Sequence, residues 1–181
     1  DTTKTTPKKR RLLRLPKATK EALAPKGIAK LVGDRRLLDS PIPSFNGVFT
    51  ARSLAKLYAA LACGGVIDGH RILSNCAIEM ASQVQTARFD HVLKIPMFWR
   101  MGYHTITTSR GFPRRAFGHF GYGGSGAWAD PKRQLAVAMT LNKIAGSPVG
   151  DSRMVRLGGT VLKSAKRHNK RLRRIDRNSI Q

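Results

Sequence analysis

The sequence predicts an α+β fold in which a meander of three short strands lies between helical segments of the chain. Residues 51–65 carry apolar side chains at spacings of three and four, as an amphipathic helix does. Three apolar runs, near 115–121, 124–129 and 134–142, are typical of strands. A further segment, from residue 151, has the composition of a closing helix. With 181 residues, of which 41% are hydrophobic, the chain is long enough to bury a core.

The first 37 residues are interpreted as a basic N-terminal arm with short helical segments. Its first part is polar and is interrupted by Pro7 and Pro16. Residues 18–33 have helical composition, but Pro25 and Gly27 divide them, so a short or broken helix is expected. Two prolines and an Asn-Gly pair then predict a loop over residues 39–47.

The helix over residues 51–65 has clear signals at both ends. Thr50 is the expected N-cap, and Gly64 with Gly65 ends the helix. A turn is predicted at Asp68–Gly69, and Ser74 can cap a second helix over residues 75–83.

The second half of the chain is predicted to be mainly strands until its last helix. The mixture of β-branched and aromatic residues indicates at least one strand around 99–107. Pro131 marks a tight turn between the second and third strands of the meander. The closing helix begins at a cap at Asp151 or Ser152, and the adjacent glycines 158 and 159 are expected to weaken its middle.

The chain is strongly basic, with a net charge of +24, and the charge is concentrated at the ends. Residues 1–36 hold 12 basic and 3 acidic side chains, and residues 151–181 hold 10 and 2. Such ends are either solvated surface or a means of binding RNA, DNA or an anionic surface, and both alternatives stay open. The alternating aromatic residues of a base-stacking module are absent, so binding would be nonspecific.

Several other functions find no support in the sequence. The chain has no run of 18 apolar residues, so no membrane span is expected. The five histidines have no metal-binding spacing, and no Gly-Lys-Ser/Thr follows the glycines of residues 121–126, so neither a metal, a phosphate loop nor a cofactor is predicted. Cys63 and Cys76 are expected to be reduced and mostly buried.

Three segments in order carry a resemblance to a known family. They are "IPSFNGVFTARSLAKLYAALACGGVIDGHRILS", "DHVLKIPMFWRMGY" and "FGHFGYGGSGAWADPKRQLAVAMTLN". Together they resemble the serine β-lactamase-like family, which includes class C β-lactamases, penicillin-binding-protein-type peptidases and esterases. The resemblance covers residues 38–166, which leaves residues 167–181 as a basic C-terminal tail.

The resemblance implies a mostly antiparallel sheet flanked by helices, as in β-lactamases and transpeptidases, with an active site beside the sheet. His119-Phe120-Gly121 occupies the place of the third family motif, K-T-G or H-x-G. It implies that His119 donates a hydrogen bond in catalysis, that Phe120 and Gly121 contact the substrate, and that the backbone amide of Tyr122 stabilises the oxyanion. Because Phe120 replaces a hydroxyl residue, small esters or amides other than β-lactams are favoured.

The other two family motifs, S-x-x-K and Y-x-N, are not found where the family has them. Ser53 and Lys56 form an S-x-x-K string, but it falls in a helix that matches a structural helix of the family. Ser125 fits a G-x-S-x-G pattern only in part, because Ala127 stands at its last position. The nucleophile therefore remains unassigned. We expect the C-terminal portion of a serine hydrolase, inactive alone. The alternative is a non-catalytic module with basic tails that bind RNA or another polyanion.

Overall fold

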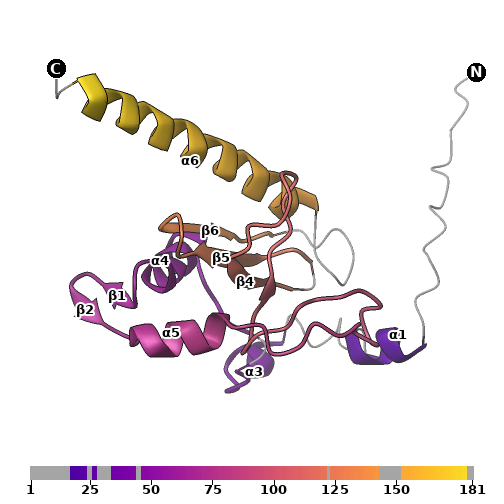
Figure 1. Cartoon of the computed structure of the whole chain (residues 1–181). Helices are drawn as coiled ribbons and strands as arrows, with labels where there is room; N and C mark the ends of the chain where they lie inside the picture. Colours follow the sequence, from indigo (N-terminus) through magenta and orange to yellow (C-terminus); the bar gives the residue numbers. More distant parts are fainter. Residues whose placement is uncertain are drawn as a thin grey trace, which may run out of the picture.

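The computed structural model describes residues 17–23, 26–27, 34–43, 46–121, 123–142 and 152–178. Its centre is an antiparallel sheet with a long helix along one face and a shorter helix packed on the other (Figure 1). This is the α+β architecture that the sequence predicts, in which helices flank an antiparallel sheet.

The described part of the N-terminal arm contains two short helices, α1 (Lys17–Leu23) and α3 (Arg35–Leu38). The predicted short helix thus begins as α1, while most of residues 24–33 lie outside the described residues. Thr19 of α1 is 3% exposed, and its hydroxyl donates a hydrogen bond to the carbonyl of Val92. The expected arm at residues 1–16 also lies outside the described residues.

Helix α4 (Ala51–Ala62) begins as predicted at Thr50. The Thr50 hydroxyl accepts a hydrogen bond from the backbone N–H of Ser53, and the Ser53 hydroxyl accepts one from the backbone N–H of Thr50. This reciprocal capping box satisfies two N–H groups that have no partner inside a helix. The helix then buries Tyr58, Leu61 and Ala62.

The predicted turn at Asp68–Gly69 joins two short antiparallel strands, β1 (Val66–Ile67) and β2 (His70–Arg71). Asp68 has a positive φ of 49°, as the first residue of such a hairpin turn requires. Helix α5 (Asn75–Ser82) follows, with Ser74 as its N-cap, which confirms the second predicted cap.

The main sheet has the strand order β3-β4-β5-β6, with antiparallel neighbours throughout. The strands are β3 (His104–Thr105), β4 (Phe117–Phe120), β5 (Gly126–Asp130) and β6 (Leu135–Met139). The three strands of the predicted meander are confirmed as β4, β5 and β6. The strand expected around 99–107 is shorter than predicted, because only His104 and Thr105 pair with β4.

Each face of the sheet has its own core. Phe117, Ala127 and Ala129 point to one face and pack with Tyr58 and other residues of α4. On the opposite face, Trp128, Phe120, Val137 and their neighbours pack with Met154 of α6 (Ser152–Asn178). Because side chains alternate along a strand, the register of the sheet decides which residues meet α4 and which meet α6.

Helix α6 begins at Ser152, one of the two predicted starts, and continues across residue 166 to Asn178. Gly158 and Gly159 do not mark a weak point in the middle of the helix. They let α6 approach residues 108 and 109 closely. A Cβ on Gly159 would lie 1.9 Å from the Ser109 hydroxyl oxygen, and one on Gly158 would lie 3.0 Å from a Thr108 methyl carbon. The backbone N–H of Ser109 also donates to the carbonyl of Val155 at 3.0 Å.

Two further expectations concern single residues and spans. Cys63 and Cys76 are free, but both are exposed, so the expectation of buried thiols is wrong. Cys63 lies just beyond the end of α4, and Cys76 is in the first turn of α5. Within the described ranges, none of the helices combines the length and the hydropathy needed to cross a bilayer.

Candidate active site

His119 lies on β4, on the face of the sheet that α4 covers. It shares this face with Phe117, two residues earlier, and it pairs with Ala127 across the strand boundary. Burial is the main cause that raises the pKa of the Tyr58 hydroxyl, and Tyr103 adds to the rise. A hydrogen bond with the backbone of His119 opposes this shift, so Tyr58 of α4 lies against the strand at His119.

The His119 side chain remains exposed, yet its ring is crowded from one side. The ring centroid of His104 lies 5.3 Å from that of His119, with the two planes at 63°. Packing removes water from the imidazole, and this lowers the pKa of His119. The ring is therefore neutral at pH 7, with one nitrogen that can donate a hydrogen bond and one that can accept.

The sequence analysis missed His104, which the structure places beside His119. His104 is 2% exposed and has partners for both ring nitrogens. Its Nδ1 lies 2.9 Å from the carbonyl oxygen of Thr105, and its Nε2 lies 3.3 Å from the backbone nitrogen of Phe120. A carbonyl can only accept and an N–H can only donate, so Nδ1 carries the proton and Nε2 accepts.

This pairing lets the His104 ring replace a strand partner. Strand β3 begins at His104, which pairs with Gly118, so Phe120 lies beyond the part of β4 that pairs with β3. The side chain of His104 supplies the acceptor and holds the end of β4, where His119 lies. Only the register between β3 and β4 produces this contact. No local sequence signal could have found it.

The environment of His104 keeps it neutral. Burial is the largest cause that lowers the pKa of His104. The Thr105 hydrogen bond opposes the shift, while the charges of His119 and Arg100 act in the same direction as burial. The ring also packs edge-to-face with Phe120, at 4.6 Å between centroids, and with Trp99 at 5.9 Å. Protonation at Nε2 would set an N–H against the Phe120 N–H.

We predict that His104 makes the stability of the fold depend on pH. Because its pKa is lowered by folding, the unfolded chain binds a proton more tightly. The contribution of the neutral His104 ring to the free energy of unfolding is fully present at a pH above about 6.5, the pKa of histidine in an unfolded chain. It is lost as the pH falls through and below that value. His104→Phe keeps an apolar ring but leaves the Phe120 N–H without an acceptor, at a cost of about 1–3 kcal/mol. Chemical denaturation at pH 8 and pH 5.5 measures both effects.

The free energy of unfolding of wild type should exceed that of His104→Phe by a large amount at pH 8 and by a smaller amount at pH 5.5. His70→Phe, at an exposed position of β2, is the matched control and should leave the stability unchanged at both values. An equal stability loss for His104→Phe at both pH values would show that the hydrogen bond to Phe120 does not depend on the neutral ring.

Gly121 follows directly after β4, and its backbone N–H donates to the carbonyl of Ser125 at 3.1 Å. A Cβ at this position would lie 3.6 Å from Nε2 of His119, which is ordinary van der Waals contact. The space above Gly121 is therefore on the same side as the His119 ring. Tyr122, whose amide the sequence assigns to the oxyanion, lies outside the described residues.

The Phe120 ring does not lie with His119. It is 9% exposed and belongs to the core on the α6 face. An apolar cavity of about 300 Å³ adjoins it on that side, and Phe120 and His104 form part of its wall. The Phe120 ring therefore faces this cavity and not the side of β4 on which the His119 ring lies, and its contact with a substrate stays a prediction. The remaining wall residues are Ile95, Pro96, Met97, Phe98, Thr105, Thr107, Phe112 and Val155.

The serines weighed as nucleophiles have other partners. The Ser53 hydroxyl belongs to the capping box of α4, and Lys56 forms an exposed ion pair with Asp68. The Ser125 hydroxyl accepts a hydrogen bond from the backbone N–H of Leu141 at 2.9 Å. As for metals, the described part of the chain holds no group of three His, Cys, Asp or Glu side chains that could bind an ion.

Comparisons with known proteins agree with this architecture. A family model described as Beta-lactamase matches residues 2–157. The chain is 40% identical over 121 residues to "Esterase/beta-lactamase LipL" of Mycobacterium tuberculosis (strain ATCC 25618 / H37Rv), which covers 66% of this chain and 28% of that protein.

Two crystal structures resemble the described fold. One is a novel penicillin-binding protein homolog from Caulobacter crescentus, with a TM-score of 0.56 and 38% identity, and it covers 60% of this chain. The other is a family VIII carboxylesterase, with a TM-score of 0.54 and 34% identity, and it covers 63%. The chain spans 30% of the length of each solved protein.

Proposed function

Because this chain belongs to the β-lactamase family, we propose that it forms the C-terminal part of a serine hydrolase for small esters or amides. In such an enzyme a serine oxygen bonds to the acyl carbon, the alcohol or amine leaves, and water then releases the acid. Two of the similar proteins are described as an esterase/beta-lactamase and a carboxylesterase. This favours an ester as the substrate.

The observation that carries the proposal is the combination of His119 and Gly121 at the end of β4. The accessible, neutral imidazole stands beside a backbone position that has no side chain. A substrate can lie along the strand at Gly121 and accept a hydrogen bond from His119. We assign His119 to positioning the substrate or the reacting hydroxyl, and Gly121 to access.

The oxyanion is assigned to the backbone amide of Tyr122, the residue that follows Gly121. Acyl transfer needs fixed N–H donors where negative charge develops on the carbonyl oxygen. In the family the second donor is the amide of the nucleophile. Tyr122 therefore supplies half of the oxyanion site in this proposal, and the protein around the nucleophile supplies the other half.

We propose that the nucleophilic serine, with its lysine and tyrosine, lies on protein that residues 1–181 do not include. The chain spans 28–30% of the length of the proteins to which it is similar, which supports this. Ser53 is held in a helix cap and Lys56 in an ion pair, so neither is poised for acyl transfer. In this proposal the isolated chain is inactive.

The cavity beside Phe120 and His104 supports an ester with an apolar group. Its wall is mainly aliphatic and aromatic, and the same His104 ring also contacts His119. An alkyl or aryl group that enters this cavity would gain from burial of its apolar surface.

The test compares isolated residues 1–181 with the complete protein that contains them. We expect hydrolysis of p-nitrophenyl butyrate by the complete protein only, because acyl transfer needs the serine and its base. A fluorophosphonate probe, which labels activated serines, should modify a serine outside residues 1–181, and mass spectrometry of the labelled peptide locates it. Any turnover by the isolated chain would contradict our assignment of the nucleophile, and its loss in Ser53→Ala would assign that role to Ser53.

The alternative is a non-catalytic module that keeps the sheet as a scaffold and binds RNA or another polyanion through its basic ends. The ester assay and the fluorophosphonate probe distinguish it from the hydrolase proposal. If the longest natural form of the protein neither hydrolyses esters nor reacts with the fluorophosphonate, the module interpretation replaces the hydrolase.

A further inference from the structure

We propose that a groove beside α6 binds the phosphate backbone of single-stranded RNA, whether or not the protein is a hydrolase. The groove has a volume of about 830 Å³ and is bounded by α6, the turn at residues 108–111 and the β5–β6 turn. Six cationic residues line it: Arg110, Arg133, Lys163, Lys166, Arg167 and Lys170. Arg110 and Arg133 lie outside α6, so the site is more than a basic tail.

The wall that carries Arg110 is held against α6 by specific contacts. Glycine at positions 158 and 159 lets the helix approach the turn closely, and the Ser109 N–H donates to the Val155 carbonyl. The Thr108 hydroxyl is buried and donates to the carbonyl of Gly111 at 2.8 Å. Because this turn is fixed to the helix, Arg110 stays near the cations of α6.

The α6 wall presents its cations at helical spacing. Lys163, Lys166, Lys170 and the adjacent Arg167 are three or four residues apart, so they share one side of the helix. From Lys163 to Lys170 the helix rises roughly 10 Å. All four are exposed. A chain of phosphates that passes along the helix could therefore meet more than one of them.

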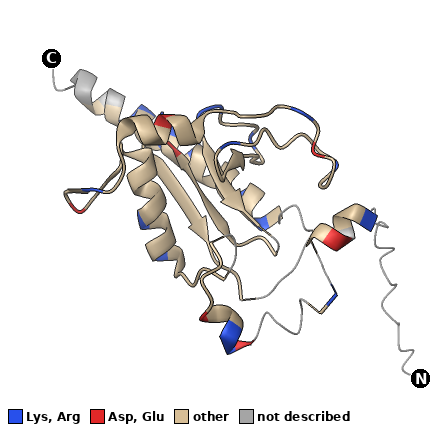
Figure 2. Ribbon diagram, turned by 90° about the horizontal axis from the view of Figure 1, so that it is seen from below, with Lys and Arg blue, Asp and Glu red and all other residues tan. Residues whose placement is uncertain are grey.

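Most cations of the groove form no ion pair with an acidic side chain of the described residues. Lys17, Arg35 and Arg36 each pair with an acidic side chain, and Figure 2 shows blue beside red on α1 and α3. Among the groove cations, Arg133 forms an ion pair with a described acidic side chain, that of Asp130. Five cations thus face one space, and an anionic ligand would relieve their mutual repulsion.

The shape of the groove favours a nucleic-acid strand over a membrane. Its cations come from opposite walls, and a broad bilayer surface cannot enter between a helix and two turns. A single strand can enter, and each phosphate that replaces counterions adds affinity. None of the lining residues is aromatic, so bases would not stack and recognition would not depend on sequence. Asn169 is the uncharged polar residue of the lining, and its amide can bond the 2′-hydroxyl that distinguishes RNA from DNA.

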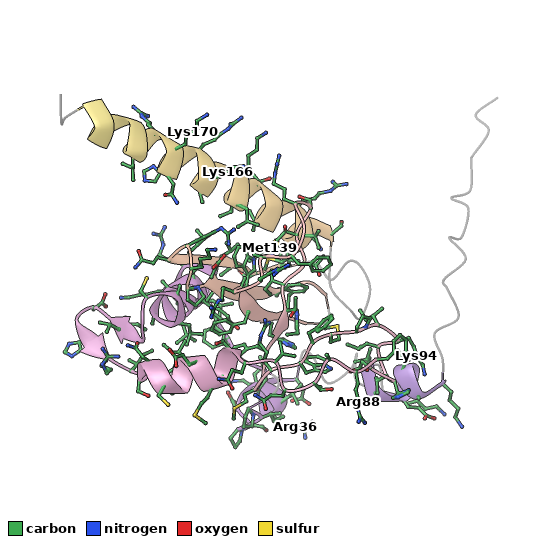
Figure 3. The ribbon with its side chains drawn as sticks, viewed as in Figure 1. Arg36, Arg88, Lys94, Met139, Lys166 and Lys170 are labelled. Carbon is green, nitrogen blue, oxygen red and sulfur yellow. The ribbon has the colours of Figure 1, made fainter. Side chains whose placement is uncertain are left out.

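Fluorescence anisotropy of the full chain with a labelled, mixed-sequence RNA of roughly 12 nucleotides tests the proposal. For five phosphate contacts, the slope of log K against log salt should be about −3.5. Lys166→Gln/Lys170→Gln should reduce this slope by about 1.4 and weaken binding on the order of tenfold at 100 mM salt. The control Arg88→Gln/Lys94→Gln removes the same charge far from α6 (Figure 3) and should change binding little.

Several outcomes would overturn the proposal. An equal loss of RNA affinity in both double variants would show that the net charge of the chain, and not the groove, drives binding. Equal affinity for DNA of the same sequence, with no effect of Asn169→Ala, would exclude the 2′-hydroxyl contact and thus RNA as the occupant. Tighter binding to anionic lipid vesicles than to RNA, weakened by Lys166→Gln/Lys170→Gln, would indicate a membrane surface instead. Circular dichroism of each variant checks that α6 still forms.

Discussion

Replacing Gly118 with alanine is expected to lower the free energy of unfolding by about 3 kcal/mol, because strands β4 and β5 approach too closely for a side chain there. A Cβ on Gly118 would lie 2.2 Å from the carbonyl oxygen of Ala127 and 2.5 Å from the Cα of Trp128. Both are backbone atoms, so no side-chain rotation relieves the clash. The sheet must open at the pair that joins Gly118 to Trp128.

Gly121→Ala is the matched comparison within the same motif. Its new Cβ would meet only the His119 ring, at 3.6 and 3.9 Å, and no strained backbone angle is involved. We expect its stability to change by less than about 0.5 kcal/mol. In the complete protein, however, its methyl group narrows the approach to His119, so the rate of ester hydrolysis should fall.

Thermal unfolding of the two variants separates these roles. The melting temperature should fall by roughly 6–12 °C for Gly118→Ala and barely change for Gly121→Ala. Similar losses in both variants would mean that Gly121 is needed for folding rather than for access. Full activity in Gly121→Ala would remove it from the proposed site.

Removing the His119 imidazole is expected to lower kcat/KM for ester hydrolysis by about 10²-fold in the complete protein, without unfolding it. A single positioned donor in an acyl-transfer site has an effect of about this size. His119 is exposed, so His119→Ala leaves no buried cavity, and melting temperatures should be nearly equal. His119→Gln keeps one donor and one acceptor and should retain more activity than His119→Ala.

The pH dependence distinguishes a chemical role of His119 from a structural one. Burial lowers the pKa of His119, so the neutral ring dominates at pH 7 and protonation begins below about pH 6.5. The wild-type rate should be flat from pH 7 to 8 with respect to this group and should change as the pH falls below that value. His119→Gln has no such titration and should lack this limb. If both proteins show the same pH profile, His119 does not take part in the reaction through its imidazole.

Local signals in the sequence were sufficient for most of the elements. The caps at Thr50 and Ser74, the turn at Asp68–Gly69 and the three strands of the meander all follow from neighbours within a few residues. A cap or a tight turn is decided by bonds between adjacent residues, so its signal survives without the rest of the fold. The helix of residues 51–65 was also predictable, because its apolar positions follow the helical period.

The candidate site was only half predictable. The H-x-G motif places His119, Phe120 and Gly121 together as candidate site residues, and their roles stay predictions. Alternation along β4 sends the Phe120 ring to the opposite face, where it packs near Trp128. Such a change of face depends on which side of the strand the helices cover, and the motif letters do not contain that information.

By itself, the sequence determined the α+β class, the order of helices and strands, the resemblance to a hydrolase family and the excess of positive charge. Tertiary structure alone decided that His104 accepts the Phe120 N–H, that the glycine pair at 158 and 159 serves close approach, and that Arg110 and Arg133 share a groove with α6. The physical reason is the distance along the chain. Each of these contacts joins segments at least 16 residues apart, and their meeting is set by strand register and helix packing rather than by neighbouring residues.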